Sequence, residues 1–189
     1  YPAWDAVPYL YLGGPINSGK TTVFNLLERL VFRPLPSSNL TAPALFRTLH
    51  EQGGTVLLDE AERLRDSSPE TGELLSMFLA GYKRGGRATR LEAVGDTYRS
   101  VEFDVFGPKA LACVKGLPPA LSSRCIPVMM FRAAPDSPKP RRRIDAEPER
   151  WRALRDDLHM LALEHGQAWL DLVQRSDVCP AMTGRDYEL

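Results

Sequence analysis

The sequence has few residues of the kinds that bind metals or form disulfides. Only three of its 189 residues are cysteines and only three are histidines. Cys113, Cys125 and Cys179 are odd in number and lack the paired spacing of a zinc site. We therefore interpret them as reduced, structural thiols and assign no metal to them.

Long apolar runs and an excess of charge of one sign are also missing. The apolar run at residues 125–131 is far shorter than the ~20 residues that cross a bilayer, and no charged-then-apolar leader opens the chain. We therefore expect a cytoplasmic protein with no membrane contact. The 24 basic residues balance the 24 acidic ones. This balance excludes a surface that is basic throughout, and it leaves only local basic patches for contact with nucleic acid.

Short apolar runs alternate with segments in which apolar residues recur at helical spacing. Strands are expected over residues 8–12, 55–58, 110–113 and 126–131, and helices over residues 21–31, 41–51 and 70–82. Such alternation predicts an α/β fold whose parallel sheet has at least four strands. Residues 89–94 and 98–103 flank Gly95-Asp96 and predict a β-hairpin.

The last third of the chain differs in composition. Residues 133–149 are rich in proline and charge, including Arg141 to Arg143, and are expected to be a linker. Beyond them, Trp151, Trp169 and the leucines between them keep helical spacing, with Gly166 as an expected break, and predict packing on the core. We therefore divide the chain into a core (1–132), a linker (133–149) and a helical region (150–189). Because it starts without a methionine and stops where a new helix begins, we expect a segment of a longer protein.

One short segment fits the phosphate-binding loop of nucleotide-binding proteins. Residues 14–21 read GPINSGKT, after an expected strand and at the start of an expected helix, and a chance match has odds on the order of one in a hundred. In such loops the glycines let backbone N–H groups surround the phosphates. Lys20 would reach the β and γ phosphates, and the Thr21 hydroxyl would bind Mg²⁺. The expected nucleotide contacts are Gly14, Pro15, Ile16, Asn17, Ser18, Gly19, Lys20, Thr21 and Thr22.

A second motif follows the expected buried strand at residues 55–58. That strand would deliver Asp59 beside the metal and Glu60 beside the attacking water. Alone, an apolar strand that ends in two acids often simply meets solvent. Together with the glycine loop, it predicts Mg²⁺-dependent binding and hydrolysis of ATP.

With both motifs placed, the chain resembles the AAA+ ATPases, which also have a hairpin before the fourth core strand. Residues 123–125 (SRC) are similar to the arginine-finger segment of clamp-loader subunits. More closely, residues 106–110 (FGPKA) and 117–126 (LPPALSSRCI) resemble a poorly characterised P-loop family of phages, plasmids and other mobile elements, often associated with primases. The resemblance covers nearly the whole chain. It implies a P-loop NTPase (AAA+-like) parallel-sheet core with an incomplete C-terminal helical lid.

The resemblance also implies roles for two arginines. Arg124 would reach the nucleotide of a neighbouring subunit in a homo-oligomeric ring, and Arg185 would act as a second sensor of the nucleotide. An ordinary surface arginine is an equal alternative for Arg124. The polar first sensor of the family is not found, because residues 113–115 (CVK) stand where Asn or Thr is common. This departure puts efficient hydrolysis in question, though not binding.

The hairpin carries a cluster of basic residues, namely Lys83, Arg84, Arg87, Arg90 and Arg99. In AAA+ helicases such a hairpin grips the phosphate backbone of DNA, whereas the alternative is a solvated, salt-bridged surface hairpin.

The preferred interpretation is ATP hydrolysis that drives translocation on, or unwinding of, single- or double-stranded DNA during replication of a mobile element, with a primase as a partner. The alternatives are an ATP-dependent loader or switch that acts on a protein without unwinding, and a small-molecule kinase.

Overall fold

The computed structural model describes residues 4–37, 41–94, 97–134, 136–137 and 148–173. Its centre is a parallel sheet of five strands in the order β2-β3-β6-β1-β7. The strands are β1 (Tyr9–Gly13), β2 (Pro34–Pro36), β3 (Thr55–Leu58), β6 (Lys109–Cys113) and β7 (Cys125–Met129). The expected α/β class and parallel sheet are confirmed. The short edge strand β2 was not expected, because its two prolines indicated only the end of a helix, although proline is tolerated at a sheet edge.

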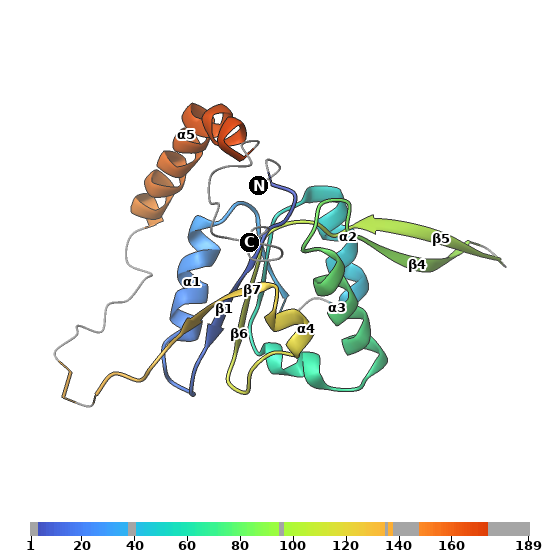
Figure 1. The fold of residues 1–189 in the computed structure, drawn as a ribbon, viewed down its shortest axis with the longest axis horizontal. Helices are drawn as coiled ribbons and strands as arrows, with labels where there is room; N and C mark the ends of the chain where they lie inside the picture. Colours follow the sequence, from blue (N-terminus) through green and yellow to red (C-terminus); the bar gives the residue numbers. More distant parts are fainter. Residues whose placement is uncertain (1–3, 38–40, 95–96, 135, 138–147, 174–189) are drawn as a thin grey trace.

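Helices cover both faces of this sheet (Figure 1). They are α1 (Lys20–Leu30), α2 (Ala42–Gln52), α3 (Pro69–Ala80) and the short α4 (Pro119–Ser122), with a 3-10 turn at Ala61–Arg65, whereas α5 (Pro148–Val173) packs against α1. The three expected helices before residue 83 are confirmed. Thr41 caps α2 by accepting a hydrogen bond from the Ala44 N–H, and Ser68 caps α3 through the Thr71 N–H.

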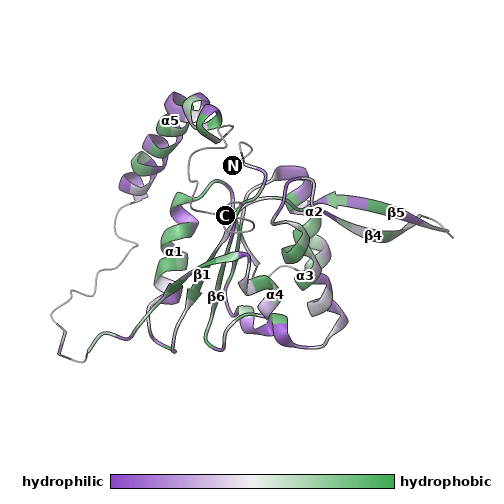
Figure 2. Cartoon of the chain, in the orientation of Figure 1, coloured by the Kyte–Doolittle hydropathy of each residue, from purple (hydrophilic) through white to green (hydrophobic). Residues whose placement is uncertain are grey.

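The core has two parts, one on each face of the sheet. On one face α2, α3 and α4 pack on the strands, and the buried Tyr9 hydroxyl donates to the Phe78 carbonyl at 2.8 Å. On the other face α1 packs through Phe24 against Leu12 and Leu57. Figure 2 shows hydrophobic residues along the central strands. The sheet is thus held between two helical layers, and its carboxyl edge is left for the loops.

The expected hairpin is also confirmed, as β4 (Arg87–Val94) paired antiparallel with β5 (Thr97–Asp104). It projects away from the sheet in Figure 1. Its base is anchored by the buried Phe103, whose ring stacks on that of Phe46 in α2 at 6.5 Å between centroids. The hairpin is therefore fixed to the α2 side of the core.

A buried lysine joins the root of the hairpin to the core. The Lys109 ammonium donates hydrogen bonds to the carbonyls of Val105 (2.8 Å), Gly107 (3.0 Å) and Gly81 (3.2 Å), and it lies 4.9 Å from the centre of the Tyr9 ring. These carbonyls belong to the segment after β5 and to the end of α3. Burial lowers the pKa of Lys109 to about 7. The sequence FGPKA at residues 106–110 is thus the junction of hairpin, helix and sheet.

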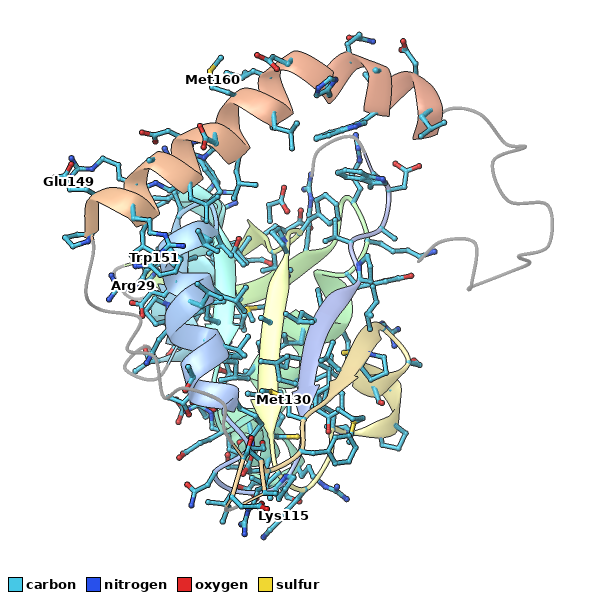
Figure 3. All side chains as sticks on the ribbon, turned by 90° about the vertical axis from the view of Figure 1, so that its left-hand side faces the viewer. Arg29, Lys115, Met130, Glu149, Trp151 and Met160 are labelled. Atoms are coloured by element: carbon cyan, nitrogen blue, oxygen red, sulfur yellow. The ribbon has the colours of Figure 1, made fainter. Side chains whose placement is uncertain are left out.

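The last helix differs from its expected form. α5 runs through Gly166 without a break and packs against α1, where His159 contacts the Phe32 ring. In Figure 3, Trp151 lies on the side of α5 that faces α1, whereas Met160 points away. Trp169 is 37% exposed, so its expected role as a packing anchor is wrong. The reason is that α5 is longer than the surface it covers within the described part of the chain.

Two expectations about the C-terminal part keep their status as predictions. The linker falls largely on residues 138–147, which are outside the described residues, and the division into core, linker and lid is untested.

Within the described residues, none of the helices has the length and apolarity to cross a bilayer.

We predict that Lys109 makes the stability of the fold depend on pH. Its pKa falls from an ordinary 10.5 to about 7 on folding, so between these values the unfolded chain binds more protons and the free energy of unfolding rises with pH. Urea unfolding at pH 7.0 and 8.5 measures this dependence. The free energy of unfolding of the parent, relative to that of Lys109→Met, should rise by about 1 kcal/mol for each pH unit. The same change at the exposed Lys83 is the control, and equal pH dependence in all three proteins would contradict the assignment.

Candidate functional site

The loop between β1 and α1 is compact and has unusual backbone angles. Gly14 has φ 151°, Asn17 φ 63° and Gly19 φ 93°. A Cβ at Gly14 would lie 2.2 Å from the carbonyl oxygen of Met130, the residue after β7 whose N–H donates to Gly13. Only glycine fits such a close approach of two backbones. The loop therefore rests directly on the sheet rather than standing free of it.

Lys20 is the first residue of α1, and its ammonium lies inside the loop. Its side chain is buried, and Nζ donates to the carbonyls of Gly14 and Pro15, both at 2.8 Å, with the Ser18 hydroxyl at 3.4 Å. The positive charge is thus fixed at the N-terminus of a helix, where the backbone N–H groups also attract anions.

The acidic motif lies beside the start of α1. The Thr21 hydroxyl donates to Asp59 Oδ2 at 3.2 Å, and the Glu60 N–H donates to Asp59 Oδ1 at 2.9 Å. Glu60 has a left-handed backbone with φ 56°, which is uncommon for a residue with a side chain and is found often at functional sites. Because β1 and β3 are parallel, the segments that follow them meet at one edge of the sheet.

These groups share one cavity of about 660 Å³. It is lined by Ile16, Asn17, Ser18, Gly19, Lys20, Thr21, Thr22, Asp59, Glu60, Glu62, Cys113, Val114 and Lys115. The residues named from the sequence for the loop and the acidic motif are therefore brought together. Gly14 and Pro15 take part through their carbonyls.

Several residues of the site were not assigned from the sequence. Glu62 lines the cavity from the 3-10 turn after Glu60, and Lys115 lines it from the segment after β6. Arg132 Nε donates a hydrogen bond to the Ile16 carbonyl at 2.6 Å and so connects the loop to the segment after β7. The position of residues 113–115 at the end of a core strand was the one signal for this group, whereas Arg132 had none.

The geometry fits a nucleoside triphosphate with Mg²⁺. Mg²⁺ takes oxygen ligands, commonly from one or two side chains together with phosphates and water, and the Thr21 and Asp59 oxygens lie side by side in the cavity. Among the described residues, no group of three or more His, Cys, Asp or Glu side chains is arranged to hold a metal ion by itself, so further ligands would come from phosphates and water. The glycine loop and the α1 N-terminus fit the phosphates.

Of the two predicted arginines, only Arg124 lies in the described part of the chain. Arg124 precedes β7, donates to the Ala120 carbonyl and lies over the Tyr82 ring at 5.7 Å from its centre. It does not line the cavity of its own chain. Arg185 lies outside the described residues, so its role as a second sensor stays a prediction.

The basic residues of the hairpin are largely paired with acids. Arg90 forms an ion pair with Glu73 and stacks on the Phe46 ring at 4.2 Å. Arg87 pairs across the hairpin with Glu102, and Arg84 pairs with Asp5 at 3.3 Å. These contacts are typical of a salt-bridged surface hairpin, the alternative to a grip on DNA. Arg141 to Arg143 lie outside the described residues.

The site combines a fixed cation, a helix N-terminus, a hydroxyl–carboxylate pair that suits a hard metal ion, and a further carboxylate beside this pair.

No protein-family model matches the chain, and no curated protein matches it either. The functional interpretation therefore depends on the motif residues and their geometry.

We predict that the close contact at Gly14 is required for the site. Gly14→Ala should lower the free energy of unfolding by roughly 2 kcal/mol, because the new Cβ meets the Met130 carbonyl at a φ that side chains rarely adopt. Gly72→Ala is the matched control, since Gly72 lies in α3 with open space around it and should gain about 1 kcal/mol. Urea unfolding compares them. Equal stability of the two variants would show that the loop does not rest on Met130.

Proposed function

We propose that this chain is a Mg²⁺-dependent ATPase with an AAA+-like P-loop core. The observation that carries the proposal is the buried Lys20 ammonium, held by the Gly14 and Pro15 carbonyls at the N-terminus of α1. Among the described residues, this buried cation has only backbone carbonyl and hydroxyl partners, an arrangement that favours binding of an anion. The Thr21–Asp59 pair lies in the same cavity as Lys20 and supports the binding of a metal ion beside this anion.

The proposed reaction follows from the roles of these groups. Backbone N–H groups of the loop bind the phosphates, and Lys20 exchanges its carbonyl partners for β and γ phosphate oxygens. Thr21 and Asp59 would hold Mg²⁺, which would supply neutralising charge to the phosphates. Glu60 accepts a proton from a water molecule whose oxygen bonds to the γ phosphorus. The bond from that phosphorus to the β–γ bridging oxygen breaks, and ADP and inorganic phosphate leave.

A ring assembly would complete the site. Arg124 lies outside its own cavity and directly before β7, which is an edge strand of the sheet. A neighbouring copy that docks on this edge would lie next to Arg124, and a guanidinium supplied across the interface would stabilise charge on the leaving phosphate oxygens. We therefore assign Arg124 to the nucleotide of the next subunit.

The work that hydrolysis drives has two candidates. The first is translocation on, or unwinding of, DNA in the replication of a mobile element, with a primase as a partner. The second is an ATP-dependent loader or switch acting on a protein without unwinding, and the pairing of Arg84, Arg87 and Arg90 with acids supports it. Stimulation of ATP turnover by single-stranded DNA distinguishes the first from the second.

Two variants should separate binding from turnover. Lys20→Ala should lose Mg-ATP binding, because the phosphates lose their fixed cation, whereas Glu60→Gln should bind normally and lose turnover by roughly 100-fold or more. Calorimetry with Mg-ATP and phosphate release measure both. Lys83→Ala, at an exposed lysine outside the cavity, is the control. Undiminished binding by Lys20→Ala would refute the P-loop assignment.

The ring assignment makes a different prediction for Arg124. Arg124→Ala should bind ATP but hydrolyse it poorly, by roughly 10³-fold. Mixed with Glu60→Gln, it should recover part of the activity, because some interfaces then pair an intact Arg124 with an intact Glu60. A residue that only packs on Tyr82 gives no such recovery. Parent-level hydrolysis by assembled Arg124→Ala, or a mixture no more active than its components, would identify Arg124 as a surface residue.

A further inference from the structure

Glu62 is an acidic residue of the cavity that neither motif explains. It lies in the 3-10 turn after β3, two residues beyond Glu60. It lines the cavity of about 660 Å³ and also an adjoining one of about 400 Å³, and in both it is accompanied by Glu60 and Lys115. Glu62 is therefore at the wall that the two cavities share.

One carboxylate oxygen of Glu62 is enclosed and has no donor among the described residues. An ionised carboxylate only accepts hydrogen bonds, and an enclosed oxygen without a donor costs free energy. Other enclosed polar atoms without partners, such as Arg63 Nε and Tyr82 Oη, do not belong to residues that line the larger cavity. The Glu62 carboxylate lines the proposed phosphate site and has one oxygen without a hydrogen-bond donor among the described residues.

The surroundings of Glu62 locate its charge near the ends of β1 and β6. Burial is the main reason why the pKa of Cys113 lies above its ordinary value, and the Glu62 carboxylate adds to the rise. Burial is also the main reason why the pKa of Tyr11 is raised to about 12, followed by its contacts with Cys113 and Cys125, and Glu62 makes the smallest contribution. Lys20 acts on Cys113 in the opposite direction. The Glu62 carboxylate and the Lys20 ammonium therefore both lie within electrostatic reach of one thiol at the floor of the cavity.

We propose that Glu62 is a positioning residue that holds the attacking water together with Glu60. The inference rests on the proposed ATPase function. The water donates one hydrogen to the Glu62 carboxylate and the other to Glu60, so that its free lone pair is directed at the γ phosphorus. Glu60 takes the proton as the new bond forms, while Glu62 keeps the water oriented. Glu62 thus supplies a strong hydrogen-bond acceptor at the cavity wall, whereas Cys113 offers only a weak donor.

The test separates binding of the ground state from binding of the transition state. ADP with beryllium fluoride mimics bound ATP, whereas ADP with aluminium fluoride also requires the in-line water. Glu62→Gln should keep its affinity for the first mimic within about 2-fold and lose affinity for the second by roughly 10-fold or more, with kcat lowered by roughly 100-fold and KM little changed. Glu62→Asp should lie between the parent and Glu62→Gln. Glu70→Gln, at an exposed position on α3, is the control and should match the parent.

The possible outcomes lead to different conclusions. Equal losses for both fluoride complexes, or a lowered melting temperature without nucleotide, would give Glu62 a structural role and overturn the inference. Unchanged kcat in Glu62→Gln would also overturn it, while the parent activity would leave the ATPase proposal intact. If the parent binds neither Mg-ATP nor the beryllium fluoride complex, the proposed function itself fails, and the inference fails with it.

Discussion

The parallel alignment of β1, β3 and β6 is the constraint on which the candidate site depends. Parallel strands end at the same edge of a sheet, so the segments after these three strands must meet there. The glycine loop follows β1, the acidic motif follows β3 and Lys115 follows β6. The order β2-β3-β6-β1-β7 keeps β1 and β6 in the interior, with helices on both faces. The functional groups are therefore held by the most deeply buried part of the molecule.

The parts of the site that could be predicted are those with local requirements. The glycines of residues 13–19 are needed by the backbone of the loop itself, and an apolar strand ending in Asp59-Glu60 needs no knowledge of distant segments. The hairpin was likewise predicted from its turn residues. Arg132 was missed because its role depends on Ile16, which is far away in the sequence. Glu62 was missed because it belongs to neither motif, and its place in the cavity beside Lys115 depends on how the chain folds.

Charge was harder to interpret from the sequence than hydrophobicity. A cluster of arginines in the sequence shows how much charge is present but not which carboxylates meet it, and Arg90 illustrates the difference. Its side chain is mostly buried, paired with Glu73 and stacked on Phe46. Lys109 is a similar case, because a lysine in the motif FGPKA is a buried structural donor. In α5, periodicity predicted a helix correctly but overestimated its burial, since spacing alone does not say how much surface lies opposite.

The central claim is that the Lys20 ammonium, which is hydrogen-bonded to carbonyls of the loop, binds the phosphates of ATP. The most direct measurement is a crystal structure with Mg²⁺ and a non-hydrolysable ATP analogue. The account predicts that Nζ leaves the Gly14 and Pro15 carbonyls for β and γ phosphate oxygens, and that Thr21 and Asp59 separate around the metal ion. If the analogue instead binds outside the loop while Nζ keeps its carbonyl partners, the account is contradicted.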